Sequence, residues 1–70
     1  MFNRKSEYTD AELNAFRDQH LANAREWETR RRECEAGAGP AGCDPTRLLQ
    51  NRDREMRMAV HYGADPNTPL

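Results

Sequence analysis

The sequence has few residues from which to build a hydrophobic core. Only 36% of its 70 residues are apolar and five are aromatic, whereas a third carry a charge. A large apolar side chain contributes roughly 1.5–3 kcal/mol when fully buried, while ordering each residue costs roughly 1–2 kcal/mol in backbone entropy. Chains of this size usually need a disulfide, a metal or a partner. We therefore expect one small domain that does not stand alone.

The sequence also lacks long apolar runs and a surplus of one charge. No segment approaches the ~18 apolar residues of a membrane span, and no apolar stretch follows the basic residues near the N-terminus, as it would in a signal peptide. We therefore expect no membrane association and a cytoplasmic location, or a place in an assembly made there, such as a virion. The net charge of −1 gives no general attraction to nucleic acid.

Glycine and proline are missing from two long segments, and their absence permits helices there. Thr9 followed by Glu12 matches a capping box, and Asp44 before Pro45 is a typical helix start. The predicted elements are a helix over about residues 10–35, a loop over residues 36–44, a helix over about residues 45–62 and a tail over residues 63–70.

Apolar residues recur at helical spacing in both predicted helices. Steps of three and four residues place one stripe on the first helix, with Leu21 at its edge: Leu13, Phe16, His20, Ala24, Trp27, Arg31 and Cys34. Its opposite face carries the ion pairs Glu26–Arg30 and Glu28–Arg32. The second helix has an apolar face of Leu48, Leu49, Arg52, Met56, Ala59 and Val60.

Two amphipathic helices joined by a short loop indicate an antiparallel pair. We predict an all-α fold, an antiparallel two-helix hairpin with extended N- and C-terminal tails that completes a larger bundle with a partner.

The tail sequence GADPNTPL, residues 63–70, resembles the loop of an ankyrin repeat. An ankyrin repeat requires a period of 33 residues and several stacked copies, and the sequence has no second copy. Both loops are helix stops, in which Gly supplies a left-handed residue and Asp-Pro-Asn makes a turn. We interpret the tail as that stop alone.

Cys34 and Cys43 flank the predicted loop, one at the end of each helix. Antiparallel helices can bring such positions to the ~5.5 Å between Cα atoms that a disulfide needs, and closing this loop would contribute roughly 2.5–3 kcal/mol. The expected cytoplasmic location instead favours two free thiols. Both states stay open, and release in a particle such as a virion would favour the disulfide.

A zinc site is a further use for these cysteines, with His20 and His61 as the remaining ligands. His20 precedes Cys34 by about 21 Å of helix, and His61 lies near the far end of the second helix. We therefore expect no metal and no cofactor. The sequence has no nucleophile–base pair or phosphate-binding loop, and a hairpin has no substrate cavity. We expect no enzymatic activity and no small-molecule substrate.

The run Arg30-Arg31-Arg32 is the one basic cluster that suggests nucleic acid. Glutamates surround it and cancel its field, so we expect no nucleic-acid partner, and Arg31 is expected to make a cation–π contact with Trp27 or an interface ion pair. The predicted function is a non-enzymatic protein–protein interaction module, either an accessory or structural subunit of a larger assembly, such as a phage or virion, or a homo-oligomer. The alternative is a small regulator or inhibitor acting on nucleic acid, or on a nucleic-acid-processing machine, through the arginine run. The predicted partner-binding residues are Leu13, Phe16, Trp27, Arg31, Leu49 and Met56.

Overall fold

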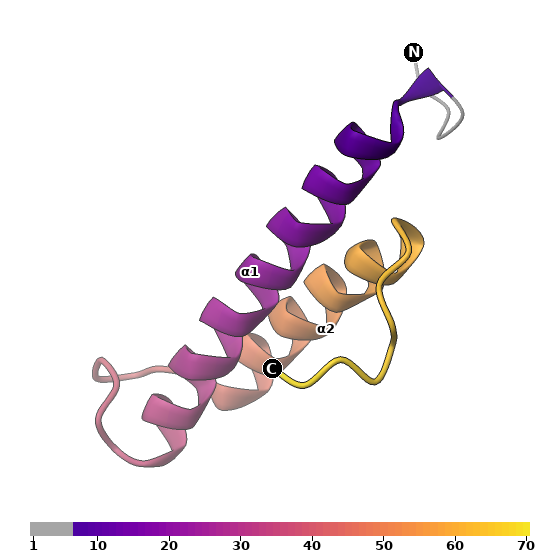
Figure 1. Cartoon of the computed structure of the whole chain (residues 1–70). Coiled ribbons are helices and arrows are strands. Elements are labelled where there is room, and N and C mark those ends of the chain that lie inside the picture. The colour runs from indigo at the N-terminus through magenta and orange to yellow at the C-terminus, as the bar shows by residue number, and fades with distance from the viewer. Residues whose placement is uncertain (1–6) are drawn as a thin grey trace.

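The chain folds into two α-helices that pack side by side in opposite directions (Figure 1). The structure, a computed structural model, describes residues 7–70. Helix α1 spans Asp10–Glu35, helix α2 spans Pro45–His61, and residues 7–70 contain no strand. The prediction of an all-α helical hairpin is therefore confirmed, whereas the larger bundle that it would complete stays a prediction.

Helix α1 begins at the predicted capping box. The backbone N–H of Glu12 donates to Oγ1 of Thr9 over 3.2 Å, and the backbone N–H of Thr9 donates to the Glu12 carboxylate over 3.1 Å. These two bonds satisfy N–H groups that the first helical turn leaves without partners. Because α1 has 26 residues and α2 has 17, the first turns of α1 extend beyond the end of α2 (Figure 1).

Helix α2 also begins as its sequence predicts. Asp44 is the N-cap, and its carboxylate accepts hydrogen bonds from the backbone N–H groups of Thr46 and Arg47 over 3.0 and 3.4 Å. The helix ends at His61, one residue before the predicted end. Gly63 has a φ of 103°, a left-handed conformation that stops the helix at little steric cost.

The loop is closed at its base by the two cysteines. The Cα atoms of Cys34 and Cys43 lie 6.0 Å apart and their sulfur atoms lie at bonding distance, 2.05 Å. Of the two states that the sequence left open, the structure has the disulfide. Gly39 lies against this bridge, since a Cβ atom there would lie 3.1 Å from the Cα of Cys34. A side chain at position 39 would therefore crowd the disulfide and require its neighbours to shift slightly.

The C-terminal tail differs from the predicted extended tail. It turns back after α2 and runs beside the helices (Figure 1). The backbone N–H groups of Asn67 and Thr68 donate to the side chain and the backbone carbonyl of Asp65, so the predicted Asp-Pro-Asn turn is present. Leu70 is half-buried. The sequence did not predict this direction, because the turn residues alone do not fix where the tail packs. The predicted N-terminal tail lies largely in residues 1–6, outside the described residues.

The packed centre between the helices is small. Within residues 7–70, the buried apolar residues are Leu21, Ala24 and Ala59. Every large side chain of these residues keeps at least 2% of its surface exposed, so none is fully buried. Glu28 is buried beside them, with 5% of its surface exposed. The buried centre therefore consists of one leucine, two alanines and a charged residue that the sequence pattern placed on the opposite, solvated face.

Candidate protein-interaction surface

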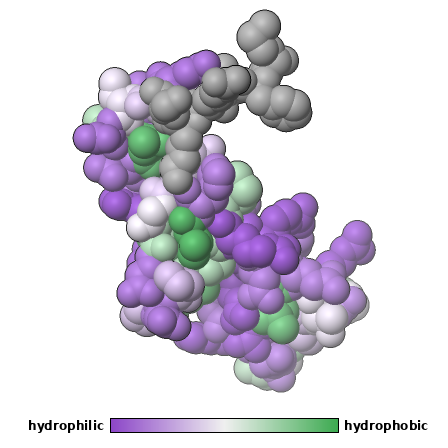
Figure 2. Space-filling model, turned by 90° about the vertical axis from the view of Figure 1, so that its right-hand side faces the viewer, coloured by the Kyte–Doolittle hydropathy of each residue, from purple (hydrophilic) through white to green (hydrophobic). Residues whose placement is uncertain are grey.

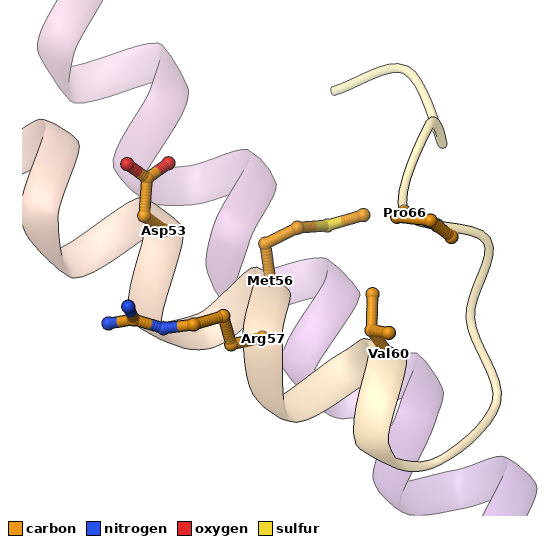
Figure 3. Close-up of a pocket in the computed structure, with 5 residues that line it drawn as sticks. All are labelled: Asp53, Met56, Arg57, Val60 and Pro66. Carbon is orange, nitrogen blue, oxygen red and sulfur yellow. The ribbon is translucent and has the colours of Figure 1, made fainter.

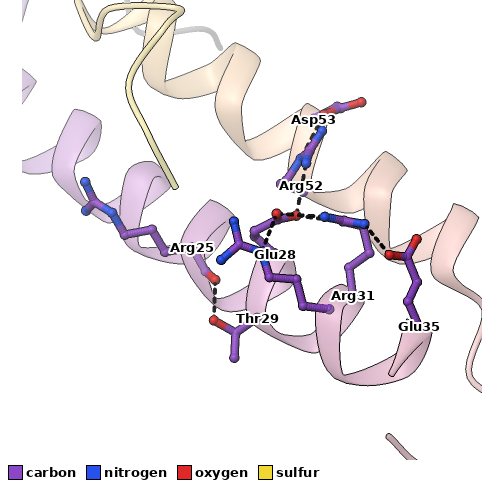
Figure 4. A network of polar contacts seen from close by, with 8 residues as sticks. Arg25, Glu28, Thr29, Arg31, Glu35, Arg52 and Asp53 are labelled. Carbon is purple, nitrogen blue, oxygen red and sulfur yellow. Dashed lines mark hydrogen bonds and ion pairs between the residues drawn. The ribbon is translucent and has the colours of Figure 1, made fainter. Parts of the chain in front are cut away.

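Glu28 is the centre of an ion-pair network between the two helices (Figure 4). Two nitrogen atoms of Arg31 donate to its two carboxylate oxygens over 2.7 and 2.8 Å. Arg32, also on α1, donates over 2.9 Å, and Arg52 on α2 donates over 3.0 Å. A buried carboxylate requires such partners because removal from water strongly disfavours its charge. We refer to Glu28, Arg31 and Arg52 as the seam network.

The seam network fixes the charge state of its members. Hydrogen bonding from Arg31, aided by Arg52 and opposed by burial, lowers the pKa of Glu28 to about 2. The bond to Glu28 in turn raises the pKa of Arg31. The pKa of Arg52 is raised first by its bond to Asp53 and then by Glu28. The network therefore stays ionised across the physiological pH range.

The arginine run is neutralised by carboxylates of its own helix. Arg30 pairs with Glu26 over 2.6 Å, as predicted, and the predicted pair of Arg32 with Glu28 is also present. Arg31 bridges Glu28 and Glu35. Its guanidinium thus points into the seam network instead of presenting a free charge for phosphate.

Trp27 has a different cationic neighbour from the predicted one. The guanidinium carbon of Arg30, not that of Arg31, lies over its ring, 5.0 Å from the ring centroid. The cation–π alternative for Arg31 was therefore wrong, because the bonds to Glu28 hold its guanidinium. Trp27 itself is half-buried. As the largest side chain of the sequence, it retains apolar area for a further contact.

An aromatic cluster occupies the end of the hairpin opposite the loop. The ring of Phe16 contacts those of Tyr8 and Tyr62, with centroids 4.9 and 5.3 Å apart, and His20 stacks on Tyr62. Nδ1 of His20 lies 2.6 Å from a carboxylate oxygen of Glu55 on α2. Phe16 and His20 therefore belong to contacts within the chain, and His20 is paired with a carboxylate.

A hollow of about 340 Å³ lies between α2 and the tail. Met56, Val60 and Pro66 form its apolar lining, and Asp53 and Arg57 complete it. In Figure 3 the side chain of Met56 reaches towards Pro66, with Val60 beside it. Val60 is exposed by 36%, so the second predicted apolar face does not pack wholly against α1. This leaves apolar surface on the outer side of α2.

A second hollow, of about 360 Å³, lies beside the disulfide. Its lining residues come from α1, the loop and α2, and they are Arg30, Glu33, Pro40, Cys43 and Leu48. Its shape depends on the closed loop, because Cys43 and Pro40 belong to that loop.

The six predicted partner-binding residues lie in different surroundings. Phe16 lies in the aromatic cluster and Arg31 in the seam network. Trp27 contacts Arg30, Met56 lines the first hollow, and Leu13 and Leu49 are half-buried. On the face seen in Figure 2, hydrophobic residues form small patches separated by hydrophilic ones. The six residues therefore lie in different local surroundings, and their joint use as one binding surface stays a prediction.

Sequence reasoning did not identify Glu28, Glu55 or Pro66 as residues that make contacts between different elements. For Glu28 a sign was available, since Arg52 lay on the predicted apolar face of α2, and an arginine there requires a buried acid. Pro66 gave no sign, because its contact depends on where the tail turns.

The described residues contain no helix long and apolar enough to cross a membrane. Residues 7–70 also contain no group of three or more His, Cys, Asp or Glu side chains arranged to hold a metal ion. Comparisons of the chain with protein-family models, with curated proteins and with solved structures found no match.

Proposed function

We propose that the chain is a non-enzymatic protein–protein interaction module. It acts as a small accessory or structural subunit of a larger assembly, or as a homo-oligomer that completes a bundle. The observation that carries this proposal is the lack of a fully buried large side chain within residues 7–70. A domain that buries so little apolar surface gains little from the hydrophobic effect. Contact with another protein would supply the missing burial.

Trp27 is the proposed anchor of that contact. Its ring is half-buried and covered by Arg30, and aromatic–arginine pairs of this kind are enriched among the residues that dominate binding energy. The setting that we propose is the cytoplasm, or an assembly made there such as a virion.

The arrangement of charge gives less support to the alternative, a regulator acting on nucleic acid through the arginine run. Each of Arg30, Arg31 and Arg32 already pairs with a carboxylate of α1. Phosphate would have to displace those carboxylates, whereas a protein partner can contact Trp27 with the ion pairs in place.

Isolation of the tagged chain from its native source, with Trp27→Ala and Thr29→Ala compared in parallel, tests the proposal. Thr29 is exposed, and among the described residues its hydroxyl donates to the backbone carbonyl of Arg25 alone, so it is a matched control on α1. We expect Trp27→Ala to weaken assembly at least 30-fold, corresponding to about 2–4 kcal/mol at a hot spot, with little loss of helicity. Full assembly in Trp27→Ala together with collapsed circular dichroism would instead assign Trp27 to an internal core.

A further inference from the structure

The outer side of α2 combines the apolar hollow with a row of exposed arginines. Steps of three and four residues place Arg47, Gln50, Arg54 and Arg57 on one face of the helix, and all four are exposed. We call Arg47, Arg54 and Arg57 the outer arginines. Arg57 also lines the hollow, so the row of charge and the apolar lining adjoin.

The outer arginines have no carboxylate partner among residues 7–70. Arg54 donates to the side-chain oxygen of Asn51, and neither Arg47 nor Arg57 makes an ion pair with another described residue. The acidic residues of α2 are engaged elsewhere, since Asp53 pairs with Arg52 and Glu55 with His20. The arginines on this face therefore differ from those of the arginine run, each of which is neutralised.

The two helices also differ in net charge. Helix α1 has seven acidic residues and five arginines, whereas α2 has four arginines and two acidic residues, giving net charges of −2 and +2. The outer face of α2 is thus the part of a chain with net charge −1 that attracts an anionic partner.

Resting on the proposed function, we infer that the hollow and the outer arginines together dock an acidic segment of a partner protein. One bulky apolar side chain of that segment enters the hollow between Met56, Val60 and Pro66. Flanking carboxylates of the segment pair with Arg57 and Arg54. A volume of about 340 Å³ is at the lower end of the range for ligand sites, which suits a side chain better than a large ligand.

Two other occupants fit the surface less well. A nucleic-acid backbone would satisfy the arginines but supplies no bulky apolar side chain for the hollow. A second copy of the chain offers few unpaired acids on α1, because Glu26, Glu28 and Glu35 are bound by its own arginines. Asp18 pairs with Arg17, and Glu12 is held by the capping box. Among the described residues of α1, that leaves Asp10 and Glu33, which lie near opposite ends of the helix. An acidic segment of another protein complements both features.

Selection of a displayed random 16-residue peptide library against the full chain tests this inference. The enriched peptides should carry net negative charge and at least one large apolar residue. Peptide binding should weaken at least tenfold in Arg54→Glu/Arg57→Glu and in Val60→Asp. It should be unchanged in Arg25→Glu, a matched exposed arginine of α1 that forms no ion pair within the described residues. Circular dichroism verifies that each variant is folded, and Arg54→Gln/Arg57→Gln replaces the charge reversal should that variant unfold.

Several outcomes would overturn the inference. They are enrichment of neutral or basic peptides, failure to enrich any peptide, and acidic peptides that bind all variants equally. Duplex DNA bound at 0.15 M salt through the outer arginines would assign the face to nucleic acid, and self-association lost in the variants would assign it to a second copy. If the native partner still depends on Trp27 in any of these cases, the proposed function stands without this inference.

Discussion

The seam between the helices and the outer side of α2 use the same residue type in opposite ways. In the seam, Arg31 and Arg52 are bound to the buried Glu28. On the outer side, Arg54 and Arg57 are exposed and pair with no carboxylate of the described residues, next to an apolar hollow. Whether an arginine of this chain stabilises the hairpin or stays available for a partner therefore depends on the groups that it contacts and not on its place in a basic run. The charges of the seam are paired within the chain, whereas the arginines of the outer side have no carboxylate partner among the described residues.

Removal of the seam carboxylate should have the largest effect. Glu28→Ala removes the carboxylate that Arg31 and Arg52 share, and each arginine keeps one other carboxylate partner. Because breaking a buried ion pair without such a remaining partner costs about 3–5 kcal/mol, we expect a loss near the lower end of that range, about 3 kcal/mol. The matched control is Glu26→Ala, since the pair of Glu26 with Arg30 is exposed and is worth about 0.2–1 kcal/mol. Thermal and urea unfolding compare the two variants. Equal destabilisation by the two variants would mean that the ion pairs of the seam contribute no more stability than an exposed surface pair.

Loss of the disulfide should have the next largest effect. Comparing it with Glu28→Ala distinguishes the stability that the closed loop contributes from that contributed by the seam. Loss of the bridge between Cys34 and Cys43, nine residues apart, should lower the free energy of unfolding by about 2.5–3 kcal/mol. Reduction and the double variant Cys34→Ser/Cys43→Ser should give the same lower melting temperature. Two alkylatable thiols in native material, found by intact mass, would show that the bridge is not formed there.

Much of the fold could be predicted because its determinants are local. Thr9 with Glu12, Asp44 with Pro45, and Gly63 each act within a few residues, so caps and helix ends follow from the sequence. The composition of the seam is not local. From Ala24, a step of three leads to Trp27 and a step of four to Glu28, and the apolar pattern favoured Trp27.

The structure buries Glu28 because Arg52, 24 residues away in the sequence, meets it from α2. Helical periodicity cannot supply that pairing, since it describes one helix at a time. The hollow also could not be predicted from the sequence, because it forms only where the tail brings Pro66 near Met56 and Val60. The sequence identified Met56 as a candidate from its place on the apolar face, but it did not identify the residues that surround Met56 in the hollow.

The seam should lose stability in acid. Since the folded-state pKa of Glu28, about 2, is below its ordinary value of 4.5, its contribution to stability is present above about pH 4.5. That contribution is lost as the pH falls towards 2. The difference in unfolding free energy between wild type and Glu28→Gln should therefore be constant from pH 5 to 8 and should shrink below pH 4.5. A difference that does not change down to pH 2 would contradict the assigned shift.

The smallest expected effect concerns nucleic acid. With Arg30, Arg31 and Arg32 paired to carboxylates, we expect a 20-base-pair duplex to bind no more tightly than ~0.1 mM at 0.15 M salt, the weak end of non-specific binding. Fluorescence anisotropy across a salt series measures this. Submicromolar binding would favour the regulator acting on nucleic acid over the interaction module.

Thermal unfolding of the isolated chain over a hundredfold range of concentration, with sedimentation velocity on the same samples, measures whether the hairpin is stable without a partner. Within residues 7–70 the buried apolar residues are Leu21, Ala24 and Ala59, and none of the large side chains is fully buried, so the chain should need further contacts. We predict either a melting temperature that rises with concentration, together with an oligomer, or a monomer that melts below ~45 °C. A monomer with a cooperative, concentration-independent transition above ~70 °C would contradict the account, because the hairpin would then be stable without a partner.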